Sequence, residues 1–140
     1  MRDGPRCVVD TNVLISAGLI RPSLPWRVLD WIVRNGQLLS SPSALDEFTT
    51  RFIWRAKFDR YVTFDERRAF AADVADAVEM VAVTTRLAIC ADPDDDKFVA
   101  LAVDGQADCL VTGNTRDFPP EHGGVPVLTP AQFAARYLDG

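Results

Sequence analysis

The chain has 140 residues but only one histidine and three cysteines, which removes several kinds of active site from consideration. His122 precedes Gly123-Gly124 in a stretch typical of a turn, so we expect an exposed loop residue that is neither a base nor a metal ligand. The cysteines form no CxxC pair and stand in apolar runs, as small buried side chains do in a reducing compartment. They are Cys7, Cys90 and Cys109. A zinc site, a disulfide framework and thiol catalysis therefore lack support.

Long apolar runs are also missing. No run approaches the roughly 18 residues that a membrane-spanning helix needs. The segment Met1–Pro5 contains an acid and a turn where a secretory leader needs a continuous apolar stretch. We therefore expect a cytoplasmic protein with no membrane segment.

Three common catalytic signatures are absent as well, namely the GxSxG, GxxxxGK[ST] and GxGxxG motifs. Serine triads, P-loop nucleotide sites and Rossmann dinucleotide sites are thus unsupported. What remains is an ordinary composition, with 48% apolar and 25% charged residues. A chain of this kind can bury a core without disulfides or metals, so we expect one folded domain over residues 1–140.

Short apolar runs alternate with helical patterns along the chain. The predicted strands are Arg6–Val9, Gln37–Ser40, Met80–Thr84, Cys109–Thr112 and Val125–Leu128. The predicted helices are Val13–Ile20, Trp26–Val33, Ser43–Trp54, Asp65–Met80 and Asp96–Val103. This alternation predicts an α/β domain with a central, mainly parallel sheet of about five strands and helices on both faces.

Carboxylates recur directly after the predicted strands. Asp10 follows the first strand, Glu47 opens the helix after the second, and Asp117 lies just past the strand at Cys109–Thr112. These acids either cap helices and complement their dipoles, or form a site, because the carboxyl ends of parallel strands meet at one edge of a sheet. Their recurrence favours a site.

The densest acidic segment is Asp92–Asp96, with four carboxylates in five residues. Helix-dipole complementation and a turn at Pro93 explain one or two of these acids, but not all of them. A divalent cation such as Mg²⁺ or Mn²⁺, which prefers oxygen ligands, would relieve their repulsion. We therefore favour a metal site over a solvated turn.

Four motifs stand in order along the chain. They are Val8-Val9-Asp10-Thr11-Asn12-Val13-Leu14, Ser43-x-x-x-Glu47, Asp92-Pro93-Asp94-Asp95-x-Lys97-Phe98 and Val111-Thr112-Gly113-Asn114-x-x-Asp117-Phe118. Together they resemble the PIN-domain family, in particular the toxins of type II toxin–antitoxin systems (VapC-like ribonucleases). The resemblance extends from about Cys7 to Leu138 and covers nearly the whole chain.

This resemblance implies a PIN-like, metal-dependent ribonuclease in which acids of the four motifs hold Mg²⁺ or Mn²⁺. The acids at the matching positions are Asp10, Glu47, Asp95 and Asp117. Asp10 is then the central ligand, Asp95 and Asp117 are direct or water-mediated ligands, and Glu47 is a ligand or orients the attacking water. The implied partners are a single-stranded or structured RNA and a cognate antitoxin protein.

Neighbouring polar residues are candidates for supporting roles. Thr11 and Asn12 either contact and orient the metal ligands or simply begin the following helix. Asn114 stands where many relatives have an acid, so a carbonyl or water-mediated contact replaces a carboxylate there.

Three acids of the third motif compete for one ligand position. Asp95 precedes Phe98 by three residues and shares its helix face, so we assign the ligand role to Asp95. We expect Asp94 to cap the helix and Asp96 to face water.

Basic residues are concentrated in one part of this acidic chain, whose net charge is −5. Residues 51–68 hold six basic and three acidic residues, whereas the chain from residue 69 onward holds four basic and twelve acidic ones. The candidate RNA contacts here are Arg51, Arg55, Lys57 and Arg60, with Phe58 and Tyr61 interleaved for base stacking. The alternative is the solvated face of two helices. The aromatic excess, which includes Trp54 and Phe64, either packs in the core or serves a homodimer or an antitoxin helix.

Three other functions remain open: a housekeeping RNA-processing PIN nuclease, a Mg²⁺-dependent phosphoryl-transfer domain and a non-catalytic, metal-stabilised binding module. A dehalogenase-type nucleophile loop needs an acid where Asn12 stands, and a receiver domain needs a lysine after a late strand, which neither Lys57 nor Lys97 provides. Cleavage of RNA with and without Mg²⁺ separates an enzyme from a binding module.

Overall fold

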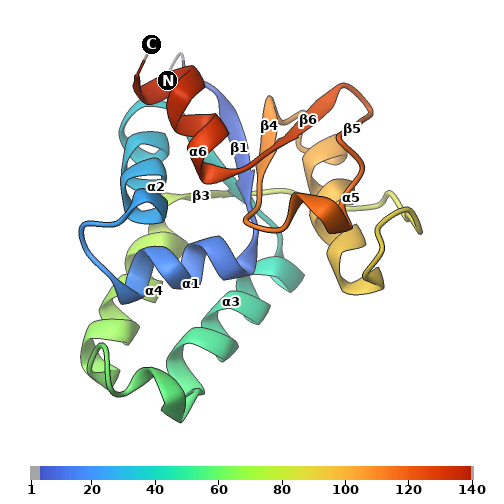
Figure 1. Cartoon of the computed structure of the whole chain (residues 1–140). Coiled ribbons are helices and arrows are strands. Elements are labelled where there is room, and N and C mark those ends of the chain that lie inside the picture. Colours follow the sequence, from blue (N-terminus) through green and yellow to red (C-terminus); the bar gives the residue numbers. More distant parts are fainter. Residues whose placement is uncertain (1–3, 140) are drawn as a thin grey trace.

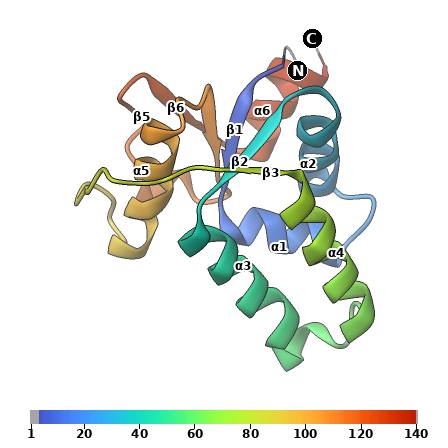
Figure 2. The same cartoon turned by 180° about the vertical axis from the view of Figure 1, so that it is seen from behind.

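The computed structural model describes residues 4–139, in which a six-stranded sheet carries helices on both faces (Figures 1 and 2). The strands are β1 (Arg6–Val9), β2 (Gln37–Ser40), β3 (Val78–Met80), β4 (Cys109–Val111), β5 (Glu121–His122) and β6 (Val125–Leu128). Their order is β3-β2-β1-β4-β6-β5, and all neighbours pair in parallel except β5 and β6. The predicted α/β class with a mainly parallel sheet is confirmed.

Five helices follow the predicted segments with shifted ends, and α6 was not predicted. The helices are α1 (Thr11–Leu19), α2 (Leu24–Asn35), α3 (Pro42–Trp54), α4 (Phe64–Ala77), α5 (Asp96–Asp104) and α6 (Pro130–Phe133). Short 3₁₀ turns lie at η1 (Ala56–Phe58), η2 (Pro93–Asp95) and η3 (Thr115–Asp117), and a π-helical turn, η4 (Ala134–Leu138), follows α6. Ser23, Ser41 and Thr63 each accept a backbone hydrogen bond at a helix start, so local capping fixes where α2, α3 and α4 begin.

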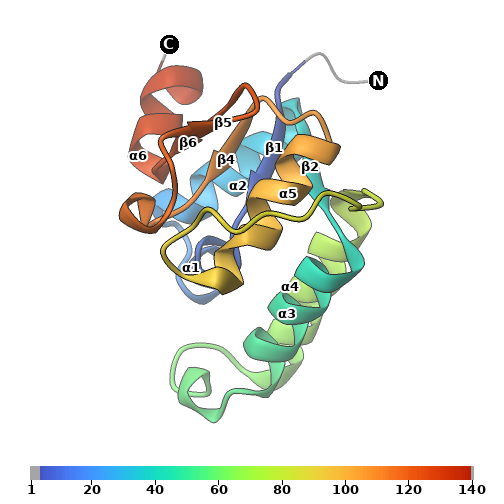
Figure 3. The ribbon, with the colours of Figure 1, turned by 90° about the vertical axis from the view of Figure 1, so that its right-hand side faces the viewer.

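Each face of the sheet has its own core because successive side chains of a strand point to opposite faces. Cys7 and Val9 of β1 contribute to the core under α1, α2, α3, α4 and α6, whereas Val8 contributes to the core under α5. Figure 3 shows α5 on one side of the sheet and α1 and α2 on the other. Two-sided burial explains why the strands read as unbroken apolar runs.

The antiparallel pair α3 and α4 extends away from the sheet as a helical hairpin (Figures 2 and 3). Phe52 of α3 packs edge-on against Phe70 of α4, with ring centroids 5.5 Å apart. Gly18 of α1 lies directly against this pair, since a Cβ at residue 18 would come within 2.5 Å of Phe52 and 2.8 Å of Phe70. The absence of a side chain at Gly18 thus lets α1 pack closely against the hairpin near its far end.

The strand predicted at Met80–Thr84 is wrong, as is the end of the preceding helix. Helix α4 ends at Ala77, and β3 occupies Val78–Met80. Met80 pairs with Ser40, the last residue of β2, after which the neighbouring chain turns into α3. The following residues have a strand-like composition but no neighbouring strand with which to pair.

The segment from residue 81 to 91 is nevertheless held in place by side chains. Val81 and Val83 pack against the core under α5. The carboxylate of Asp104 accepts hydrogen bonds from the backbone N–H groups of Thr84 and Thr85, at 2.7 and 2.9 Å. This segment is therefore an ordered connection without helix or strand.

Two expectations about single residues are also corrected. His122 is half-buried in β5, which pairs antiparallel with β6, so it does not lie in a turn. Cys7 and Cys109 are fully buried as predicted, whereas Cys90 is half-buried, and all three are free thiols. Within residues 4–139, no helix is both long and apolar enough to cross a membrane.

Candidate active site

Asp10 lies at the carboxyl end of β1, where it has two roles at once. Its Oδ1 accepts a hydrogen bond from the backbone N–H of Val13 at 3.0 Å, which caps α1. Its Oδ2 accepts a hydrogen bond from the hydroxyl of Thr112, the residue after β4. The side chain is only 6% exposed, and this burial raises the pKa of Asp10, although the bonds from Thr112 and Val13 oppose the shift. Asp10 is therefore both a helix cap and a buried carboxylate at the sheet edge.

Asp95 brings a second carboxylate to the same place. Burial and the negative charges of Asp92, Asp10, Asp117 and Asp94 raise the pKa of Asp95 to about 6. Carboxylates from three motifs that lie far apart in the sequence thus repel one another here. Acids of the first, third and fourth motifs therefore lie close enough together at this edge of the sheet to interact.

The local register of the third motif differs from the prediction. Asp92, not Asp94, is the capping residue, because its side chain accepts a hydrogen bond from the backbone N–H of Asp94 at 3.0 Å. Asp95 ends η2 and occupies the N-cap position of α5. The 3₁₀ turn at Pro93–Asp95, which the helical pattern did not indicate, causes this shift.

Asp96 was predicted to face water, but it is half-buried and also contacts the backbone of the preceding segment. Its Oδ1 accepts hydrogen bonds from the backbone N–H groups of Ile89 and Cys90, at 3.0 and 2.8 Å. Burial alone would raise the pKa of Asp96, but these hydrogen bonds lower it. Asp96 therefore holds the end of the 81–91 segment against α5.

Glu47, on α3, lies between two cations. It forms an ion pair with Lys97 of α5 and a second one with Arg51, one helical turn further along α3, at 2.9 Å. Its side chain is 13% exposed, and burial lowers the pKa of Lys97. Sequence reasoning had not given Lys97 a role, although it stands inside the third motif.

Asp117 joins the site through a short chain of hydrogen bonds. Asn114 donates from its side-chain amide to Oδ2 of Asp117, and its backbone N–H donates to the hydroxyl of Thr112 at 3.1 Å. Because Thr112 in turn donates to Asp10, the first and fourth motifs are connected. Thr112 is fully buried, and sequence reasoning missed it.

A cavity of about 140 Å³ opens at the centre of these residues. Its lining residues are Asp10, Thr11, Asn12, Glu47, Arg51, Asp92, Asp94, Asp95 and Phe98. We call this cavity the acidic pocket. Asp117 and Asn114 are not among the lining residues, and the basic candidates Arg55, Lys57 and Arg60 lie elsewhere.

The acidic pocket has the donor set of a hard divalent cation, although the carboxylates are not drawn together around one point. Within the described part of the chain, no group of three or more histidine, cysteine or acidic side chains is assembled to hold a metal ion. Burial and repulsion by neighbouring carboxylates both raise the pKa of Asp95, and a bound cation relieves such repulsion. The hydroxyl of Thr11, a lining residue, is buried and has no hydrogen-bond partner. Oxygen ligands that repel one another beside an unpartnered buried hydroxyl fit such an ion.

The family of the chain is shown by comparison with known proteins. The model of the PIN domain matches residues 6–116, and the chain belongs to this family. PIN domains are generally nucleases and typically depend on a divalent metal ion.

Two individual proteins are similar to this chain. The uncharacterized protein MJ1680 of Methanocaldococcus jannaschii is 31% identical over 112 residues, which cover 78% of this chain and 70% of that protein. The fold is similar to that of a chain in the crystal structure of VapBC2 from Rickettsia felis bound to a DNA fragment from their promoter. That similarity has a TM-score of 0.62 at 15% identity and covers 89% of this chain and 98% of the other.

Proposed function

We propose that this protein is an Mg²⁺- or Mn²⁺-dependent endoribonuclease that hydrolyses RNA phosphodiester bonds at the acidic pocket. The observation that carries the proposal is the buried carboxylate of Asp10 beside Asp95, whose pKa is raised by burial and by the surrounding carboxylates. Carboxylates that repel one another need a function, because their repulsion opposes folding. Membership of the PIN family supports a nuclease over a phosphoryl-transfer domain.

In this proposal Asp10, Asp95 and Asp117 hold the ion directly or through water, and Glu47 is a further ligand or orients the attacking water. A bound Mg²⁺ or Mn²⁺ would supply an activated water and neutralise charge on the phosphate in the transition state. Thr112 fixes the rotamer of Asp10, since it occupies one carboxylate oxygen while Val13 occupies the other. Asn114 orients Asp117 in the same way.

In this proposal the positive charges of Arg51 and Lys97 reduce the electrostatic repulsion between the acidic pocket and a polyanion. Both form ion pairs with Glu47, so they place two positive charges beside a carboxylate of the site. A phosphate of RNA that enters the pocket meets these two side chains as well as the acids.

The proposed biological role is the toxin of a type II toxin–antitoxin pair, with a cognate antitoxin as partner. The order of the four motifs and the fold shared with a chain of VapBC2 support this role over a housekeeping RNA-processing enzyme. The two roles differ in a simple way: expression of a toxin without its antitoxin arrests growth.

The test compares the wild-type chain with Asp10→Asn and with Asp76→Asn, which changes an exposed acid on α4 outside the pocket. We expect the wild type and Asp76→Asn to cleave single-stranded RNA with Mg²⁺ and not with a chelator, and Asp10→Asn to be inactive. If the wild type does not cleave RNA, a non-catalytic, metal-stabilised binding module is the better interpretation. RNA cleavage in vitro without growth arrest in a bacterial host would favour the housekeeping role.

A further inference from the structure

The far end of the α3–α4 hairpin exposes large apolar side chains to solvent. We define the hairpin tip as residues 54–64 together with Ile20, which follows α1. Trp54 is 70% exposed and Tyr61 is 55% exposed, and Ile20 is 56% exposed. Large apolar side chains exposed in one part of a protein indicate a binding site more often than single exposed residues do.

The hairpin tip also has an excess of positive charge. Among residues 4–139, none of Arg55, Lys57 and Arg60 has a carboxylate within ion-pair distance. The acid closest to them in sequence, Asp59, is already paired with Arg67 at 2.5 Å. The tip therefore presents unpaired cations on a chain that is acidic as a whole.

A cavity of about 390 Å³ lies at the hairpin tip and combines these two properties. Its lining residues are Leu19, Ile20, Lys57, Phe58, Arg60 and Tyr61, and none of them is acidic. We call this cavity the tip pocket. It offers two cations and an aromatic ring beside an apolar floor, which suits a flat, anionic ligand such as a nucleotide.

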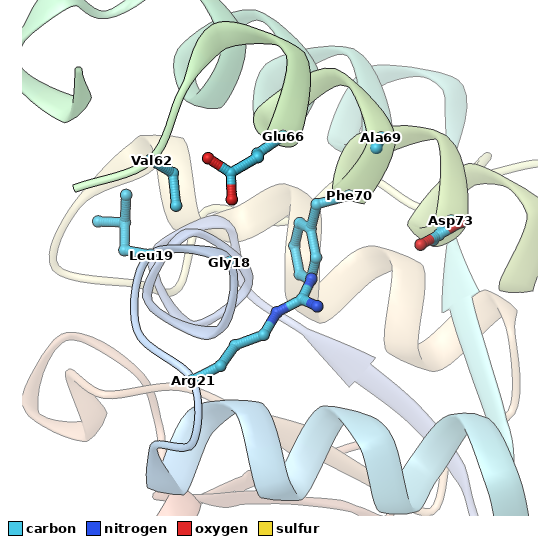
Figure 4. A pocket seen from close by; sticks show the side chains of 8 residues that line it. All are labelled: Gly18, Leu19, Arg21, Val62, Glu66, Ala69, Phe70 and Asp73. Atoms are coloured by element: carbon cyan, nitrogen blue, oxygen red, sulfur yellow. The ribbon is translucent and has the colours of Figure 1, made fainter.

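A neighbouring cavity of about 320 Å³ shows the contrast. It lies between the end of α1 and α4, and Figure 4 shows Glu66 and Asp73 of α4 on either side of Phe70, whose ring Arg21 covers. Two carboxylates against one guanidinium disfavour an anion there. The tip pocket is therefore the better candidate for a phosphate-bearing ligand.

We propose that the tip pocket binds a nucleotide of single-stranded RNA, with the base stacked on Tyr61 and the adjacent phosphates bound by Lys57 and Arg60. The proposal rests on the RNA-cleaving function proposed above and adds a second RNA contact to it. A base in a duplex is stacked on both sides and cannot insert a face into the pocket, so this surface selects unpaired RNA.

The position of the tip pocket suits one strand that also enters the acidic pocket. Asp10 precedes α1 and Leu19 ends it, and a nine-residue helix is about 13 Å long. Helix α3 also leads from the acidic pocket, where Arg51 lies, toward Trp54 at the tip. One RNA strand can thus follow these helices between the two pockets.

The tip is held in shape before any ligand arrives. Arg67 of α4 is 2% exposed and donates to the backbone carbonyl of Arg55 at 3.0 Å as well as to Asp59. Through these contacts it fixes both ends of η1, which supplies Lys57 and Phe58 to the pocket. A preformed pocket loses less entropy on binding than a loop that must first become ordered.

The experiment measures binding of a fluorescently labelled, unpaired RNA of about twelve nucleotides to the uncleaving Asp10→Asn chain by anisotropy over a range of salt concentrations. We expect Lys57→Gln with Arg60→Gln to weaken binding at least tenfold and to reduce the slope of log K against log salt by about 1.4. Tyr61→Ala should weaken binding about tenfold and Tyr61→Phe should restore it, because Phe keeps the ring. The charge-matched control is Arg34→Gln with Arg136→Gln, two exposed residues on α2 and η4, and it should bind as the parent does.

Several outcomes decide the matter. If the tip variants bind RNA with the affinity and salt dependence of the parent, and the wild-type chain cleaves RNA, the tip pocket does not bind RNA and the proposed nuclease function stands. If RNA binding depends on the tip but the wild-type chain does not cleave RNA, the result supports the tip pocket and contradicts the proposed nuclease function. Equal affinity for a duplex would overturn the proposal, as would tip variants that change the oligomeric state but not RNA affinity, since the tip would then be a protein interface. Thermal melting of each variant confirms that these exposed substitutions leave the fold intact.

Discussion

Thr112 donates a hydrogen bond from its hydroxyl to Oδ2 of Asp10, so the residue after β4 orients the carboxylate after β1. The parallel register explains the contact, because Val9 pairs with Val111 and the next residues of the two strands lie side by side. Both side chains are buried, at 0% and 6% exposure. The sheet itself thus fixes the rotamer of the carboxylate most central to the proposed chemistry.

Replacing Thr112 by Val should therefore leave Oδ2 of Asp10 buried without a donor. We expect a loss of about 1–3 kcal/mol in the free energy of unfolding near neutral pH, measured by urea denaturation. Since the bond from Thr112 lowers the pKa of Asp10, its removal should also move the acid limb of the RNA-cleavage profile to higher pH. Thr112→Ser keeps the hydroxyl and should retain both properties. Equal pH profiles for the Val and Ser variants would contradict the positioning role.

Asp95 predicts a specific dependence of stability on pH in the metal-free protein. Its pKa is about 6 in the folded chain against an ordinary value of 3.8, so folding takes up a proton between these values. The contribution of this group to stability is full below about pH 4 and is lost as the pH rises to 6. Asp95→Asn should hence raise the melting temperature above pH 6 in the presence of a chelator, whereas Asp76→Asn should not. A lower melting temperature of Asp95→Asn at pH 7 would count against the repulsion.

A divalent ion should reverse this effect. In the proposed function Mg²⁺ or Mn²⁺ binds only the assembled pocket, so at ten times its dissociation constant it should stabilise the fold by about 1.4 kcal/mol. Asp10→Asn should abolish that gain and RNA cleavage, yet melt at the same or a higher temperature without metal. Asparagine can still cap α1, and one repelling charge is gone. Differential scanning calorimetry with and without the ion checks this, and an unchanged metal response in Asp10→Asn would exclude Asp10 as a ligand.

How much of this site could be predicted depended on how local each feature is. Asp10 and Asp95 were predictable because each follows a strand or opens a helix within its own motif. Thr112 acts through the pairing of β1 with β4, and Lys97 through the docking of α5 beside α3, so no local pattern marks their partners.

The fold shows the same limit. The alternation of apolar runs predicted the parallel sheet, but β5 is two residues long and exists only through its pairing with β6. The run after Met80 has strand composition, yet β2 ends at Ser40 and offers it no partner. The composition of a segment indicates which secondary structure it can form, and the neighbouring segments determine which one it forms.

Asp96 should matter for stability rather than for chemistry. Asp96→Ala removes the acceptor of two backbone N–H groups, those of Ile89 and Cys90, and should cost about 1–3 kcal/mol. Hydrogen exchange should show earlier opening of residues 81–91, with metal affinity unchanged. Asp94→Asn, which alters an exposed acid of the same motif, should be mild in both stability and activity. Loss of metal affinity in Asp96→Ala at full stability would instead make Asp96 the ligand of the third motif.

The last prediction concerns Lys97, which holds Glu47 in an ion pair. Lys97→Gln removes a positive charge beside the carboxylates and frees one oxygen of Glu47, so the affinity for Mn²⁺ should rise several-fold in calorimetric titration. RNA affinity should fall in the same variant, because a cation available to the phosphate has been lost. Lys97→Arg keeps the charge and should restore RNA binding while keeping the affinity for Mn²⁺ near that of the wild type. The opposite signs separate the proposed role from simple structural damage, which would lower both affinities together.

Arg51→Gln offers the matched comparison on the other side of Glu47, where the second ion pair is 2.9 Å long. If Lys97→Gln weakens Mn²⁺ binding, the ion pair positions Glu47 for the metal instead of competing with it.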